Sequence, residues 1–330
     1  MAKPNSKSRR RAKIAAALTV TFIALFAFAF LGVVIMLSNY ADSLAAEDDI
    51  AIGSEAPSNP FYVLLIGSDS RKGTAIYTGK ENEHAQVDQH SDVMTLMRVD
   101  PKNHVVTLVS VPRDTVIEGQ NDKINNALRS NNPEDVVKAV GDLTGVYADY
   151  YMMTSFISFE NLINALGGID IRVPKTVSVS DPATGKNVTV KAGKNRHLNG
   201  SEALVLARAR KEYSHDEDAL RQMNVRSIER AMIEKVLKGR EEIDIEHVLT
   251  ALQDDTKTNL DLSSVGLLLT QFVEHADEVV IYDCTGPHEG SNREEDGVWV
   301  VSSDGDTWRR LMEVVSEGKD PSGIVATPSF

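Results

Sequence analysis

Three short stretches of the chain place carboxylates and arginines at the ends of apolar runs. They are residues 67–71 (GSDSR) after the run 61–66, residues 91–92 (SD) before the run 93–99, and residues 111–115 (VPRDT) after the run 104–109. Ligand crevices in α/β proteins form at strand ends. Asp69 and Asp92 are carboxylates of the kind that bind Mg²⁺, and the forked side chains of Arg71 and Arg113 match phosphate oxygens. The set suits a divalent metal with a pyrophosphate, although for any single residue a solvated charge is the simpler explanation.

A fourth cluster follows later in the chain. If residues 207–211 are extended, Arg208 and Arg210 point the same way. Arg221 falls on the apolar face of the helix predicted next, and an inward arginine needs an anionic partner. A bound phosphate and a structural salt bridge to Asp218 are both open as that partner.

Apolar patterning predicts the elements that would position these residues. Strands are expected at 61–66, 93–99, 104–109, 150–153, 169–173, 279–282 and 298–301, with a tight turn at 100–103 and a polar hairpin or loop over 178–197. Helices are expected at 133–143, 158–166, 199–206 and 219–237, with two more candidates at 245–252 and 262–273. This alternation predicts an α/β (αβα) fold in which helices flank a single mixed β-sheet.

Several other chemistries find no pattern in the sequence. It contains no Walker A, G-x-G-x-x-G, G-x-S-x-G or H-E-x-x-H motif. Its 8 histidines are scattered, which indicates no histidine zinc site, and the lone Cys284 excludes a cysteine zinc cluster. The net charge is −13 although residues 1–13 are basic, so general nucleic-acid binding is not expected.

The N-terminal region predicts a membrane anchor. Residues 14–37 carry no charge, and a helix of that length would span about 36 Å, more than the roughly 30 Å of a bilayer core. Basic residues precede this run and acidic residues follow it, which places the N-terminus in the cytoplasm and the rest outside. A cleaved signal peptide is the alternative, but the run is too long for one. The expected order is a cytoplasmic tail (1–13), a transmembrane helix (14–37), an extracellular stalk (38–60), a main domain (61–240) and a C-terminal extension (241–330) packed on or continuing that domain.

This organisation and a series of ordered motifs resemble the LytR-CpsA-Psr family. The motifs, over roughly residues 61–238, are GSDSR, SDVMTL, VPRDT, KINNA, DYYM, LGGIDIRVP, LNGSEAL, ARAR and a later D-x-x-R. The resemblance implies a phosphotransferase of the bacterial cell membrane with an extracellular catalytic domain. Such an enzyme moves a glycopolymer, such as teichoic acid, capsule or arabinogalactan, from a polyprenyl pyrophosphate carrier to peptidoglycan. A non-catalytic lipid-binding member, or a regulator of envelope genes, is the alternative.

The resemblance also assigns a cofactor and residue roles. It implies Mg²⁺ (or Mn²⁺) on Asp69 and Asp92, with Asp92, Arg113 and Arg221 as catalytic residues and pyrophosphate cleavage as a side activity. An apolar groove for the lipid carrier is expected too. The side chains that would hold the pyrophosphate are Arg71, Arg113, Arg208, Arg210 and Arg221.

The sequence departs from the family pattern at several positions. His90 stands where an arginine is usual, and Leu220 where a glycine is usual. In one register, residues 224–225 (NV) replace a usual Arg-Gln pair. In a shifted register, residues 221–222 (RQ) are that pair, and Asp218 replaces an earlier arginine.

Overall fold

The computed structural model describes residues 58–69, 89–117, 119, 122–213, 216–238, 248, 256–260, 272 and 274–327. In this part of the chain no helix has the length and apolar character needed to cross a bilayer. The predicted transmembrane segment 14–37 lies outside these residues, as do most of the stalk 38–60 and most of the helix candidates 245–252 and 262–273.

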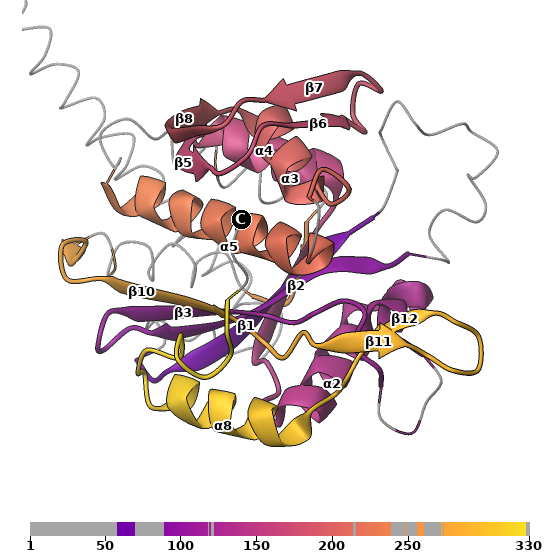
Figure 1. Ribbon diagram of the computed structural model, residues 1–330. Helices are drawn as coiled ribbons and strands as arrows, with labels where there is room; N and C mark the ends of the chain where they lie inside the picture. The colour runs from indigo at the N-terminus through magenta and orange to yellow at the C-terminus, as the bar shows by residue number, and fades with distance from the viewer. Residues whose placement is uncertain are drawn as a thin grey trace, which may run out of the picture. The chain divides into compact units, whose positions relative to one another are not determined.

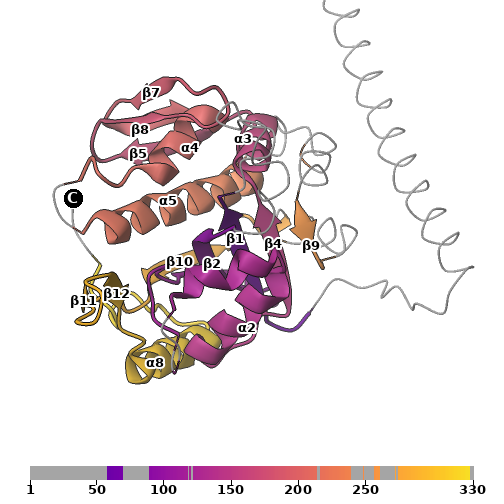
Figure 2. The ribbon, with the colours of Figure 1, turned by 90° about the vertical axis from the view of Figure 1, so that its right-hand side faces the viewer.

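A central mixed sheet organises the fold. Its six strands lie in the order β10-β3-β2-β1-β4-β9. Their bounds are β1 Phe61–Ser68, β2 Ser91–Asp100, β3 Val105–Ser110, β4 Tyr150–Thr154, β9 Lys257–Thr258 and β10 Val280–Thr285. Strand β2 runs antiparallel to both β1 and β3, whereas β4 is parallel to β1 and β10 is parallel to β3. Figures 1 and 2 show the sheet from two directions, and β4 and β9, which end the strand order on one side, are labelled in Figure 2.

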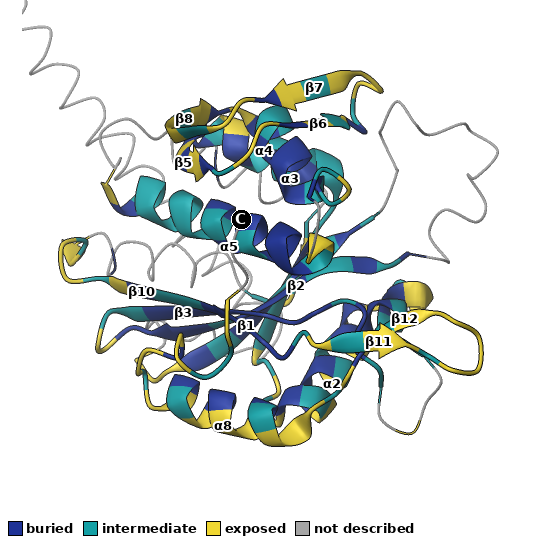
Figure 3. Cartoon of the chain, viewed as in Figure 1, coloured by how far each residue is buried: buried dark blue, intermediate teal, exposed yellow. Residues whose placement is uncertain are grey.

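Helices cover both faces of this sheet, so the predicted mixed α/β fold is confirmed. Strand β1 is apolar throughout because both of its faces are buried: Leu64 packs with helices α2 (Pro133–Thr144) and α8 (Gly305–Ser316), whereas Val63 packs on the side of α5 (Glu217–Lys238). In Figure 3 the inward sides of α2 and α8 are dark and their outer sides are light. Continuous burial of this kind explains why β1 shows no apolar–polar alternation.

Three small ribbons accompany the central sheet, so the expectation of a single sheet was wrong in this respect. They pair β5 (Ile169–Val173) with β8 (Gly193–Leu198), β6 (Val177–Ser180) with β7 (Asn187–Val190), and β11 (Gly290–Asn292) with β12 (Trp299–Val301). The first two ribbons, with α3 (Phe156–Ala165) and α4 (Gly200–Arg208), form a core that α5 completes. Helix α5 thus lies between this core and the central sheet (Figure 1).

Two helical elements had no predicted counterpart. They are the 3₁₀ helix η1 (Ile124–Ser130) and α8, whose Trp308 is completely buried. Elsewhere, local sequence explains where helices begin: Asn132 caps α2 just before Pro133, and Asn199 with Glu202 forms a capping box on α4. Residues 207–211 were considered as an extended segment, but this was wrong for residues 207–208, because α4 continues to Arg208.

Candidate functional site

The topology of the sheet brings the stretches around Asp69, Asp92 and Arg113 together at one end of its strands. Since β2 is antiparallel to its neighbours, the end of β1, the start of β2 and the end of β3 lie together. A polar pocket of about 440 Å³ opens there. Its lining residues are Asp69, His90, Asp92, Arg113, Asp114, Lys123, Asn125 and Asn126.

A close approach of β1 and β2 places Asp69. A Cβ atom on Gly67 would lie 2.9 Å from the Cβ of Val93, so only glycine fits there without a shift of the strands. Just beyond it, Asp69 Oδ1 accepts a hydrogen bond of 2.8 Å from the His90 backbone N–H. The His90 Nδ1 atom lies 3.4 Å from the other carboxylate oxygen. His90 therefore holds the Asp69 carboxylate at the mouth of the pocket.

A hydrogen-bonded turn places Arg113 and Asp114. The hydroxyl of Thr115 donates to the Pro112 carbonyl at 2.7 Å, which closes the turn. The Asn125 N–H at the start of η1 donates to the Arg113 carbonyl at 3.2 Å. From the C-terminal part of the chain, the Val301 N–H donates to the Asp114 carbonyl at 2.9 Å. Residues beyond 240 therefore support the site loop directly.

The acidic and basic side chains that line the pocket form ion pairs with one another. Arg113 donates a hydrogen bond to Asp92, and Lys123 Nζ donates to Asp114 Oδ1 at 2.8 Å. Arg113 Nε is buried and has no hydrogen-bond partner among the described residues, and the same is true of Asn125 Oδ1. Arg113 Nε also lies 4.0 Å from Asp114 Oδ1, so the guanidinium is shared between two carboxylates of the pocket.

The sequence analysis did not select Lys123, Asn125 and Asn126 as site residues. They belong to the KINNA motif, so the motif itself was the available signal. Its residues reach the pocket because Ile124 N–H donates to the Thr115 carbonyl at 2.8 Å.

Asp218 at the start of α5 is the centre of a second ion-pair cluster. Its carboxylate accepts hydrogen bonds from Arg221 Nε at 2.9 Å and Gln222 Nε2 at 2.7 Å, and Arg210 Nε lies 3.4 Å away. Burial alone would raise the pKa of Asp218, but the Arg221 and Arg210 charges hold it at about 2. Of the two partners considered for Arg221, the structure shows the salt bridge.

Arg221 links this cluster to the polar pocket. Only 5% of its side chain is exposed. Burial opposes its charge, yet the carboxylates of Asp218, Asp92 and Asp114 together raise the pKa of the guanidinium above its usual value. Asp92 and Asp114 line the pocket, so Arg221 lies within electrostatic reach of it.

The remaining arginines differ in placement. The Arg208 guanidinium lies over the Phe156 ring, 5.0 Å from its centroid, and donates to the Ser180 carbonyl at 2.7 Å. Arg208 and Arg210 do not share an environment, because one ends α4 and the other follows it in a turn. Arg71 lies outside the described residues.

A larger pocket, of about 610 Å³, lies between α2 and the start of α8. Its walls include Ala139, Leu143 and Arg309, and it contains none of the site residues predicted from the sequence. It is neither uniformly apolar nor at the strand ends, so the polar pocket is the candidate site.

Comparison with known proteins agrees with the ordered motifs. The profile of the LytR_cpsA_psr family matches residues 32–315. The chain belongs to the LytR_cpsA_psr family. The resemblance found in the sequence is thereby confirmed, and the match includes β10, β12 and most of α8 beyond residue 240.

Named relatives in this family are transferases. The chain is 29% identical to a protein of Bacillus mycoides and 30% identical to one of Bacillus cereus, each over 249 residues that cover 73% of both chains. Both relatives are called polyisoprenyl-teichoic acid–peptidoglycan teichoic acid transferase TagU.

Solved structures of the family share the fold. The crystal structure of Bacillus subtilis TagV superposes with a TM-score of 0.62 at 22% identity, and covers 79% of this chain and 98% of that one. A structure described as TagT bound to LIIa-WTA gives a TM-score of 0.60 at 21% identity, with 82% and 98% covered. At these levels of sequence identity, the similarity shows a shared fold.

Proposed function

We propose that this protein transfers a glycopolymer from a polyprenyl pyrophosphate carrier to peptidoglycan. The observation that carries the proposal is the polar pocket, where Asp69 and Asp92 face Arg113 and Lys123 at the meeting point of three strand ends. The names of the TagU relatives support the class of donor and acceptor.

The charges of the pocket suit a metal ion together with a pyrophosphate. In the described structure its carboxylates are paired with its own cations, as in the Arg113–Asp92 and Lys123–Asp114 pairs. A divalent cation would draw the carboxylates, and the phosphate oxygens would take their place on Arg113 and Lys123.

Asp69 and Asp92 are the residues that would hold Mg²⁺ or Mn²⁺. Their side chains are about one-third exposed and present hard oxygen ligands, which fits either ion. When bound, the ion would offset the negative charge of the pyrophosphate. His90 fixes one of these ligands through its backbone N–H.

The chain's own residues suggest how the transfer would proceed. A hydroxyl of the acceptor forms a bond to the phosphorus that bears the glycopolymer, and the bond to the bridging oxygen breaks, which releases polyprenyl phosphate. Arg113 and Lys123 stabilise the charge that develops on the phosphate oxygens. Arg221 adds positive potential to the pocket. Asp92 is also the candidate acceptor of the hydroxyl proton.

Membrane anchorage through residues 14–37 belongs to the same proposal. The apolar run and its basic flank would hold the domain on the outer surface, where lipid-linked polymer and peptidoglycan meet. An apolar groove for the polyprenyl chain remains a prediction.

A transfer assay tests the proposal. The full-length protein in detergent is incubated with Mg²⁺, peptidoglycan and a lipid-linked oligosaccharide labelled on its sugar. We expect label to appear in the insoluble peptidoglycan. A parallel reaction that contains a chelator should show no such label. Release of soluble label would instead indicate pyrophosphate cleavage, and the absence of any product would contradict the proposed transfer.

Binding without chemistry is the second candidate. It is favoured by the pairing of Arg113 with Asp92 and of Arg221 with Asp218, which leaves both arginines partly neutralised. If the lipid stabilises the protein against heat and no product forms, the protein is a binding or regulatory member of the family.

A further inference from the structure

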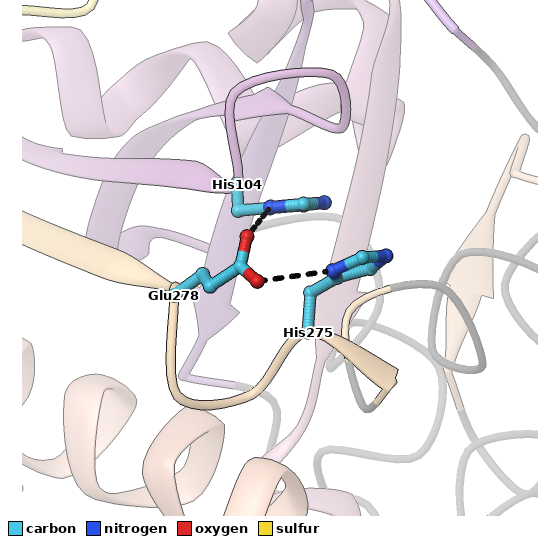
Figure 4. Close-up of side chains that lie close together, drawn as sticks. All are labelled: His104, His275 and Glu278. Carbon is cyan, nitrogen blue, oxygen red and sulfur yellow. Dashed lines mark ion pairs between the residues drawn. The ribbon is translucent and has the colours of Figure 1, made fainter.

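Two histidines and a glutamate converge at the other end of the central sheet (Figure 4). His104 Nδ1 lies 3.4 Å from one carboxylate oxygen of Glu278, and His275 Nδ1 lies 3.6 Å from the other. One potential ligand atom from each residue lies within 4.8 Å of the other two. Among the described residues, no other group of three histidine, cysteine, aspartate or glutamate side chains brings its potential ligand atoms this close together.

The topology separates this cluster from the polar pocket. His104 immediately precedes β3, whereas Arg113 follows its end, and Glu278 precedes β10, which runs parallel to β3. Six strand residues at about 3.3 Å each place roughly 20 Å between the two ends. The residues of the cluster therefore have no part in the transfer site.

Backbone hydrogen bonds join the segments that carry the three residues. The His104 carbonyl accepts a hydrogen bond of 2.9 Å from the Val280 N–H, which joins the start of β10 to the turn before β3. The Glu278 N–H donates to the His275 carbonyl at 2.8 Å, so these residues lie on one turn. His104 has φ 53°, a left-handed conformation that histidine adopts more readily than most residues.

We propose that His104, His275 and Glu278 bind a divalent transition-metal cation of the Zn²⁺ class. Two imidazoles and a carboxylate are ligands that Zn²⁺ prefers, and water would complete the coordination. Side-chain exposures of 14% for His104, 44% for His275 and 68% for Glu278 leave a way in for the ion. Phe272 packs edge-on against His104, with ring centroids 6.1 Å apart, and forms an apolar wall behind the ligands.

Binding requires a small rearrangement of the rings. The two imidazoles are stacked, with centroids 4.2 Å apart and planes at 18°. A metal ion lies in the plane of each imidazole that binds it, at about 2.0–2.1 Å from the nitrogen. His275 must therefore rotate out of the stack, and its exposure permits this rotation.

A Zn²⁺ titration of the full-length protein tests the proposal. Calorimetry is expected to show one Zn²⁺ per chain in excess Mg²⁺, which is included to compete for the carboxylates of the polar pocket. His275→Ala and Glu278→Gln should each weaken binding by at least about tenfold, because a ligand is lost. With Co²⁺ in place of Zn²⁺, a visible absorption band of tetrahedral type is expected for the wild type and not for the variants.

His197→Ala is the matched control. His197 Nδ1 lies 3.2 Å from Asp170 Oδ1, and its side chain is 58% exposed. Within the described part of the chain this histidine–carboxylate pair has no third ligand. The control should bind Zn²⁺ like the wild type. Equal Zn²⁺ affinity in wild type, His275→Ala and Glu278→Gln would overturn the proposal, as would the absence of saturable binding to the wild type. Either outcome would mean that the three side chains form only an ion-pair cluster.

Discussion

Arg221 and Asp218 form a buried ion pair, with Arg221 Nε 2.9 Å from Asp218 Oδ1, at the N-terminal end of α5. The pair lies where the helix meets the polar pocket, because Asp92 and Asp114 also act on the charge of Arg221. Arg221 therefore satisfies a structural carboxylate and adds positive potential to the candidate site. These two roles can be separated by experiment.

Arg221→Ala is expected to destabilise the protein. It leaves the Asp218 carboxylate without its main partner. Because Gln222 and Arg210 still lie beside Asp218, the loss should stay below the roughly 3–5 kcal/mol that follows when a fully buried pair is broken from one side. Chemical denaturation of wild type and variant measures this loss. The double variant Asp218→Ala/Arg221→Ala should lose less than the two single variants added together, and strict additivity would show that the pair is not coupled.

The double variant Asp218→Ala/Arg221→Ala also tests whether Arg221 adds positive potential to the candidate site. If its charge contributes to phosphate binding, a polyprenyl pyrophosphate lipid should raise the melting temperature of Asp218→Ala/Arg221→Ala less than that of Asp218→Ala, which keeps Arg221. Equal stabilisation of the two proteins by the lipid would remove Arg221 from the binding site.

Arg113→Ala is expected to lose transfer activity while the domain stays folded. Its side chain is 22% exposed, and it pairs with an Asp92 that water can still reach. Charge-assisted bonds to phosphate contribute about 1.5–3 kcal/mol each, so transfer should fall by roughly ten- to a hundredfold. Arg113→Lys should restore part of the rate, since an ammonium group keeps the charge but not the planar fork.

Arg129→Ala is the control for this experiment. Arg129 lies on the same loop-and-η1 region and pairs with Asp122, but its side chain is 51% exposed and does not line the polar pocket. Its activity should match the wild type. If Arg113→Ala and Arg129→Ala behave alike, the pocket is not the phosphate site.

Asp69→Asn is expected to raise the Mg²⁺ concentration needed for half-maximal transfer. An amide keeps the shape and the hydrogen bond from His90 but removes the negative charge that a hard cation requires. Transfer measured across a Mg²⁺ series checks this. Asp170→Asn, at an exposed carboxylate on β5, is the control and should leave the Mg²⁺ dependence unchanged. An unchanged dependence in Asp69→Asn would exclude Asp69 as a metal ligand.

The polar pocket was largely predictable from the sequence because strand-end residues depend on local patterning. The apolar run before Asp69 and the run before Arg113 each predicted a strand, and antiparallel pairing then brought their ends together. Lys123 could not be placed in this way, since η1 reaches the pocket through hydrogen bonds that no periodicity encodes.

Two further features depended on contacts between distant parts of the chain. His104 and His275 are far apart in sequence and meet only because β10 pairs with β3. Helix α8 was missed although Trp308 anchors it: a Cβ on Gly286 would lie 2.1 Å from the Trp308 ring, so the ring packs directly on backbone. The signal for this helix was present in the sequence, because its buried residues Trp308, Leu311, Met312 and Val315 recur at helical spacing.

A buried acid on α5 predicts how stability depends on pH. Burial raises the pKa of Glu229 from 4.5 to about 7, although the Thr95 hydroxyl and the Arg226 guanidinium favour its charged form. The folded state therefore binds a proton more tightly than the unfolded state does. Stability contributed by this group is complete below about pH 4.5 and is lost as the pH rises through 7.

Glu229→Gln should remove most of this dependence. The variant is expected to lose less stability than the wild type between pH 5 and pH 8, by on the order of 1–3 kcal/mol. Glu160, whose pKa burial and Asp181 also raise to about 7, titrates in the same window, so the difference between wild type and variant isolates Glu229. Denaturant unfolding at the two pH values measures the effect. Parallel pH profiles for the two proteins would mean that the Glu229 carboxyl is not protonated at neutral pH, and that Arg226 compensates its charge fully.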